Sequence, residues 1–120
     1  MAQPVILAAI LSLMAVLSPE WQMTAELRTV SSVIVERQNV VTGERIVRVF
    51  HQPAFLDKLR VTRIHEVEIE GQPAMRIRFG NYQWWWVWPR PNLGDLSDEN
   101  GIALDVEEKF IQELLREVLN

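Results

Sequence analysis

The chain begins with a stretch that is apolar on every side. Residues 4–17 hold twelve apolar residues in fourteen, and no charged side chain occurs before Glu20. A fourteen-residue helix rises about 21 Å, which is less than the roughly 30 Å hydrocarbon core of a bilayer. A signal peptide normally starts with a positive charge, and none is present. We therefore favour a buried apolar helix at 4–17, with a cleaved signal peptide and a membrane anchor as the alternatives.

A helix start signal follows this stretch. Ser18 is a good N-cap, Pro19 suits the first helical position, and Glu20 favours the positive end of the helix dipole. These residues predict a short helix over 19–27. Further along, Ala54–Leu59 is compatible with a single helical turn.

Polar and apolar residues alternate between Arg28 and Trp88, which is typical of strands. Strands are expected at Arg28–Gln38, Glu44–His51, Arg60–Glu70, Ala74–Gly80 and Tyr82–Trp88. Asn39–Gly43 forms the first turn, and Pro89 and Pro91 end the last strand.

The third and fourth of these strands are predicted to form a hairpin around Gly71-Gln72-Pro73. One register pairs apolar residues on one face and opposite charges on the other. The apolar-face pairs would be Ile69–Met75, Val67–Ile77 and His65–Phe79. The charged pairs would be Glu68–Arg76 and Glu66–Arg78.

The alternation of polar and apolar residues ends after Trp88. Residues 89–104 are rich in Pro, Asn, Asp and Gly and predict a loop. Asp105 and Glu108 resemble a capping box for a helix over 105–119. Its apolar stripe comprises Val106, Phe110, Ile111, Leu114, Leu115 and Val118.

Together these elements predict one α+β domain over residues 1–120. An antiparallel sheet of about five strands over 28–88 would carry helices from both termini on one face. The sheet surface that receives the C-terminal helix would contain Val67, Ile69, Met75 and Ile77.

Composition narrows the classes of protein. With 48% hydrophobic residues, the chain is not of the disordered class, and the lack of cysteine excludes disulfides, thiol nucleophiles and Cys-ligated zinc. The net charge is -4, yet residues 28–90 carry ten Lys or Arg and six acids, whereas residues 91–120 carry two and eight. We expect the basic strand region to pair with the acidic C-terminal region.

The run of tryptophans in 82–88 is the strongest candidate for a binding site. On a strand, alternate side chains share a face, and successive rings lie about 6.5–7 Å apart. One face would hold Tyr82, Trp84, Trp86 and Trp88, and the other Gln83, Trp85 and Val87. Since a strand in a small domain seldom buries both faces, one of them is expected to stay partly exposed. Arg76 and Arg78 would lie nearby and favour an anionic ligand, although filling the core is an equally good use of these rings.

Catalytic and metal-binding patterns are weak. His65 is expected in the core beside Phe79, and His51 at the surface, with no metal spacing between them. An EF-hand alignment places Asp98, Asn100 and Glu107 at ligand positions but puts Leu96 at the first, so Asp98–Gly101 is predicted to be an ordinary turn. We expect no catalytic residues, no metal and no cofactor.

The resulting expectation is a small non-enzymatic binding or interaction module that uses Tyr82–Trp88 and forms part of a homo- or hetero-oligomer. A cytoplasmic location is favoured. The first alternative is an exported or membrane-anchored envelope protein, with 4–17 as its signal or anchor. The second is an aromatic platform for a sugar or single-stranded nucleic acid, built from Tyr82–Trp88 with Arg76 and Arg78.

Overall fold

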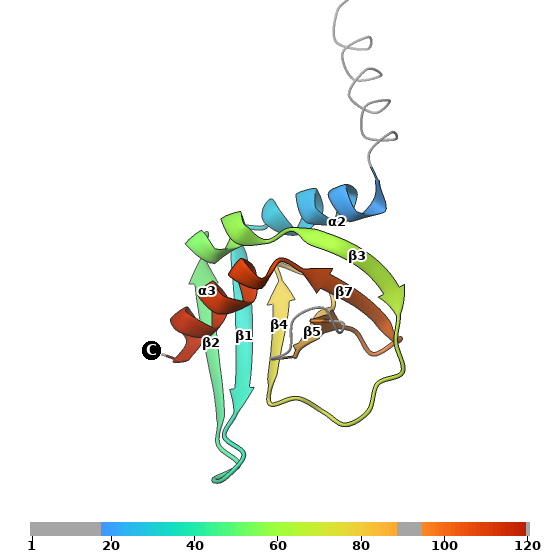
Figure 1. Ribbon diagram of the computed structural model, residues 1–120. Helices are drawn as coiled ribbons and strands as arrows, with labels where there is room; N and C mark the ends of the chain where they lie inside the picture. Colours follow the sequence, from blue (N-terminus) through green and yellow to red (C-terminus); the bar gives the residue numbers. More distant parts are fainter. Residues whose placement is uncertain (1–17, 89–94, 120) are drawn as a thin grey trace, which may run out of the picture.

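The computed structural model describes residues 18–88 and 95–119, which form an α+β fold built on a seven-stranded antiparallel sheet (Figure 1). The sheet order is β2-β1-β4-β5-β6-β7-β3. The strands are β1 (Ser32–Gln38), β2 (Arg45–His51), β3 (Val61–Glu66), β4 (Met75–Phe79), β5 (Trp84–Val87), β6 (Leu96–Ser97) and β7 (Ile102–Val106). The helices are α2 (Pro19–Arg28), the 3-10 helix η1 (Ala54–Lys58) and α3 (Glu108–Leu119). The apolar helix predicted at 4–17 lies outside the described residues.

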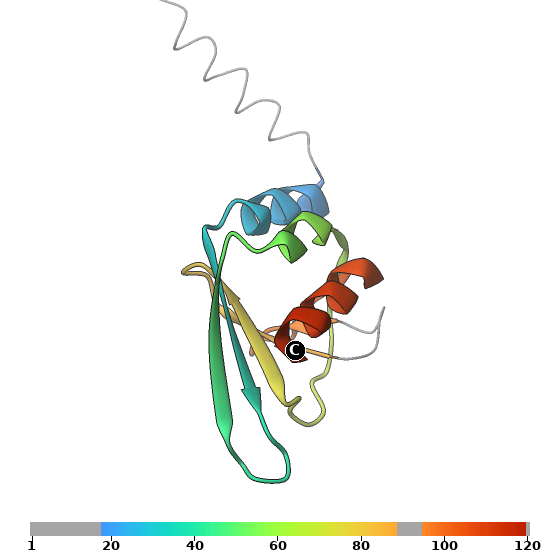
Figure 2. The same cartoon turned by 90° about the vertical axis from the view of Figure 1, so that its left-hand side faces the viewer.

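One face of the sheet carries the core. Figure 2 shows α2, η1 and α3 on the same side of β1, β2 and β4. The predicted stripe of α3 is buried at Phe110, Ile111, Leu114 and Val118. Edge-on ring contacts link Phe50 of β2 to Phe55 of η1 and then to Phe110, with centroid separations of 5.4 and 6.1 Å. The α+β architecture with helices from both ends of the described chain is therefore confirmed.

Several local predictions are also confirmed. The Ser18 side chain accepts a hydrogen bond from the Trp21 backbone N–H and caps α2. The single helical turn after β2 is η1. In the β1–β2 turn the Asn39 carboxamide accepts from the Val41 and Thr42 N–H groups, and Gly43 has a φ of +74°. These features depend on neighbouring residues alone.

The predicted hairpin between Arg60–Glu70 and Ala74–Gly80 is wrong. Strand β3 pairs with β7, whereas β4 pairs with β1 and β5. Opposite Arg76 stands Glu36 rather than Glu68, and opposite Ile77 stands Val35 rather than Val67. A distant strand therefore supplies the same pairing chemistry as the expected neighbour. Val67 and Ile69 lie beyond the end of β3 and are only half-buried.

The C-terminal boundaries also differ from the prediction. Part of the loop expected at 89–104 forms β6 and most of β7, which bring the sheet to seven strands. Asp105 lies in β7 rather than capping a helix, and α3 begins at Glu108. The reason is that Val106 pairs with Val61 and faces the core, so the strand continues past the capping position.

Candidate binding face

Successive side chains of β5 point to opposite faces of the sheet, as the alternation predicts. Trp85 is 1% exposed and Val87 is buried toward the helices, whereas Trp84 and Trp86 are half-buried on the opposite face. The indole Nε1 of Trp85 has no hydrogen-bond partner in the described part of the chain, so this ring contributes packing. One face of the strand therefore serves the core and the other remains partly open.

The ends of the predicted strand behave differently. Tyr82 lies in the turn before β5 and is 43% exposed, so it does not continue the row of rings. Trp88 follows the strand, and its Nε1 donates a hydrogen bond of 2.7 Å to Ser97 Oγ. Only Trp84 and Trp86 share the outer face within β5 itself.

Arg76 ties the two outer tryptophans to the neighbouring strands. It lies opposite Trp86 in the β4–β5 ladder, and its guanidinium stands 4.2 Å from the centroid of the Trp84 ring. Its Nε and Nη2 both donate to Glu36 Oε2, at 3.1 and 2.7 Å. Because one side of Trp84 is covered by this guanidinium, that ring is less available for stacking.

Glu36 holds a second arginine. Its Oε1 lies 3.1 Å from Arg45 Nε, and the Glu36 side chain is 14% exposed. One carboxylate therefore orients two guanidinium groups, and the cluster carries a net charge of +1. We call Glu36, Arg45, Arg76, Trp84 and Trp86 the outer tryptophan face.

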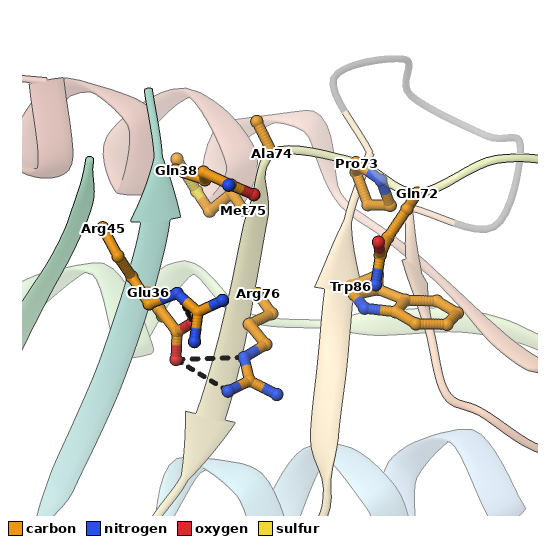
Figure 3. A pocket seen from close by; sticks show the side chains of 9 residues that line it. All are labelled: Glu36, Gln38, Arg45, Gln72, Pro73, Ala74, Met75, Arg76 and Trp86. Atoms are coloured by element: carbon orange, nitrogen blue, oxygen red, sulfur yellow. Dashed lines mark hydrogen bonds and ion pairs between the residues drawn. The ribbon is translucent and has the colours of Figure 1, made fainter. Parts of the chain in front are cut away.

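A cavity of about 250 Å³ opens on this face (Figure 3). Its polar and aromatic lining comes from Glu36, Gln38, Arg45, Gln72, Arg76 and Trp86. Figure 3 shows Glu36, Gln38 and Arg45 on one side of it and Gln72 and Trp86 on the other. Strands β1, β2, β4 and β5 and the segment before β4 all contribute to it.

The predicted site residues are only partly brought together. Arg76 and Trp86 line the cavity, and Trp84 contacts Arg76. Arg78 lies opposite Trp84, and its Nε donates to the Tyr82 carbonyl oxygen at 3.0 Å, away from the cavity lining. Glu36, Gln38, Arg45 and Gln72 were not predicted, since β1 and β2 reach the cavity only because β1 pairs with β4 as well as with β2.

His65 forms a separate pair with a carboxylate. Its Nε2 lies 3.0 Å from Asp105 Oδ1, with side chains 18% and 7% exposed. The prediction that His65 lies beside Phe79 is wrong, because β4 is not adjacent to β3. The residue opposite His65 is Ala103 of β7. No hydroxyl of residues 18–88 or 95–119 hydrogen-bonds to His65.

The turn predicted at Asp98–Gly101 is confirmed. Asp98 Oδ1 accepts hydrogen bonds from the N–H groups of Asn100 and Ile102, and Gly101 has a φ of +80°. The carboxylate thus satisfies its own turn. Across the described residues, no group of three or more His, Asp or Glu side chains could hold a metal ion.

Within residues 18–88 and 95–119, no helix is both long and apolar enough to cross a membrane. No protein-family model, curated protein or solved structure matches this chain.

Proposed function

We propose that this protein is a non-enzymatic binding module whose binding surface is the outer tryptophan face. The observation that supports it is the half-buried position of Trp84 and Trp86, which alternate along β5 with the buried core residues Trp85 and Val87 and so lie on the other face of the strand. Trp and Arg dominate the affinity of many interfaces because they bury a large area and lose little side-chain entropy when already held in place.

The Trp84 ring is held before any ligand arrives. Arg76 is fixed by Glu36 and covers Trp84, so these three side chains form one linked unit. The core does not need Trp84 or Trp86, since the inner face of β5 already supplies Trp85 and Val87. These features favour recognition over packing as the role of the outer tryptophans.

Alanine substitutions separate the two roles. Trp85→Ala removes a fully buried ring and is expected to lower the free energy of unfolding by about 3–5 kcal/mol. Trp84→Ala and Trp86→Ala should each cost about 1 kcal/mol or less, measured by urea denaturation. Losses from the outer substitutions as large as that of Trp85→Ala would assign all three rings to the core and end the proposal.

Occupancy of the face is tested in the native host by photo-crosslinking. A photoreactive amino acid at position 86 should give an adduct that the same group at Gln112, on the exposed side of α3, does not give. Adducts at both positions in equal yield, or at neither, would contradict the proposal.

A second candidate function is self-association through β2. This strand ends the described sheet, pairs with β1 without a register shift, and exposes Val47 and Val49 by 56% and 54%. The opposite edge is protected, because β3 has a register shift at Val61/Arg63 and contacts α2. A long, regular edge strand with exposed apolar side chains is a template for a further strand, and we propose a second copy as its occupant.

Sedimentation across a range of concentrations tests this association. The wild-type chain is expected to dimerise, and Val47→Lys should shift it to the monomer by placing charge on the edge. Val41→Lys makes the same change in the exposed β1–β2 turn and should leave the dimer intact. A wild-type chain that stays monomeric at all concentrations rules this candidate out.

A further inference from the structure

We propose that the cavity beside Trp86 binds an acidic monosaccharide unit, a hexuronate, through its carboxylate and its ring hydroxyls. The inference rests on the proposed function, because the cavity belongs to the outer tryptophan face. Three features of the lining correspond to three parts of such a sugar: guanidinium groups to the carboxylate, side-chain amides to the hydroxyls, and an indole to the apolar face of the ring.

The two arginines retain donors for a carboxylate. Glu36 engages Arg45 through Nε and Arg76 through Nε and Nη2. Both terminal nitrogens of Arg45 and Nη1 of Arg76 make no hydrogen bond with any described residue. Because the cluster holds two cations and one anion, a second carboxylate completes its charge balance.

Two carboxamides provide the hydroxyl contacts. Gln38 and Gln72 line the cavity from opposite sides, and neither side chain hydrogen-bonds within the described residues (Figure 3). A carboxamide donates and accepts at once, as a sugar hydroxyl does, so the two groups match each other. A simple carboxylate such as acetate would leave both amides without a ligand partner.

Trp86 provides the apolar surface. Figure 3 shows its indole on the side of the cavity opposite Glu36, with the Gln72 side chain extending toward it. The C–H groups on one face of a pyranose ring are apolar and can cover an aromatic ring. Pockets for drug-sized ligands measure about 300–1,000 Å³, so a cavity of about 250 Å³ suits a single sugar unit.

Calorimetric titration of the full chain with sodium glucuronate, glucose and sodium acetate tests the match. Glucuronate is expected to bind about tenfold or more tighter than either glucose or acetate, because only it engages all three parts of the lining. Equal affinity for acetate would reduce the site to a bare anion site and overturn the proposal. Equal affinity for glucose, or no heat with glucuronate, would overturn it as well.

Substitutions in the cavity lining test whether glucuronate binds there. Arg45→Gln and Trp86→Ala are each expected to weaken glucuronate binding about tenfold, whereas Arg116→Gln, on α3, should leave it unchanged. Undiminished binding by Arg45→Gln and Trp86→Ala would place the sugar elsewhere. An adduct from position 86 in the host combined with no glucuronate binding would overturn this inference while leaving the proposed function intact.

Discussion

At the scale of single residues, the Glu36 carboxylate organises the charge of the outer tryptophan face. It forms ion pairs with Arg45 in β2 and with Arg76 in β4 and so connects three strands through one side chain. Both arginines are partly exposed, so water and salt weaken these ion pairs. The contribution of Glu36 to stability is therefore modest, and its main effect is on the position of the two guanidinium groups.

Replacing Glu36 by glutamine tests how much its ion pairs contribute to stability. Glu36→Gln is expected to lower the free energy of unfolding by about 1 kcal/mol in low salt, and the difference should shrink in about 1 M NaCl. Urea denaturation at the two salt concentrations gives both values. Glu113→Gln, which removes an exposed pair with Arg116 within α3, should change little in either. A Glu36→Gln loss of equal size at high salt would show that the carboxylate acts mainly through hydrogen bonds.

At the scale of elements, α2 protects the β3 edge of the sheet. The Thr24 hydroxyl is buried between the two, donating to the Glu20 carbonyl oxygen at 2.7 Å and accepting from the Val61 N–H at 2.9 Å. The Arg28 side chain adds hydrogen bonds to the carbonyl oxygens of Asp57 and Leu59 around η1. The Thr24 hydroxyl thus gives an acceptor to the Val61 N–H, a backbone group at the start of β3 that would otherwise be buried without a partner.

Thr24→Val keeps the shape of the side chain and removes its hydrogen bonds. Because the Val61 N–H then loses its acceptor in a buried place, the free energy of unfolding is expected to fall by about 1–3 kcal/mol. Thr29→Val is the matched control, since Thr29 donates only to Glu26 at the exposed end of α2. Thermal unfolding should show a clear drop for Thr24→Val alone, and equal effects at both positions would refute the edge-protection role.

Local features of the elements can be predicted from the sequence, whereas the pairing of distant strands cannot. The cap at Ser18, the β1–β2 turn and the inward position of Trp85 follow from neighbouring residues or from a period of two. The partners of β3 and β4 do not, since Glu36 and Glu68 offer Arg76 the same charge and only the complete sheet selects Glu36. A period-two pattern fixes the face of a residue and leaves its neighbouring strand open.

The residues of the candidate site also fall into two groups, those that the sequence indicates and those that only the sheet order brings to the site. Trp86 and Arg76 stand out in the sequence by residue type and alternation. Gln38 and Gln72 are polar residues without any local signal, and they reach the cavity because β4 lies between β1 and β5. At Asp105 the local signal was misleading. The sequence predicted a helix cap, but Asp105 pairs with β3 as part of a strand.

At the scale of the whole molecule, the expected charge pairing between the strand region and the C-terminal region is partial. Arg60 pairs with Glu107, and Arg48 donates to the backbone carbonyl oxygens of Glu117 and Val118 at the end of α3. Cations at a helix C-terminus complement its dipole. Arg45 and Arg76 instead pair with Glu36, within the strand region itself.

The apolar stretch at 4–17 lies outside the described residues, so its role is left to experiment. The hypothesis of a buried helix predicts that the protein from its native host retains these residues and stays in the soluble fraction. N-terminal sequencing combined with membrane fractionation measures both. Cleavage near residue 17 would identify a signal peptide, and recovery of the intact chain with membranes would identify an anchor.

The pairing of β3 with β7 has a consequence for how the chain is made. Strand β3 closes one end of the sheet, and its partner follows about forty residues later in the sequence. During synthesis β1 and β2 can join as soon as both have left the ribosome, whereas β3 must wait until residues 102–106 emerge. Through that interval its apolar residues stay open to chaperones or to mispairing with nascent neighbours. Ribosomal pausing before residue 102 would lengthen this exposure.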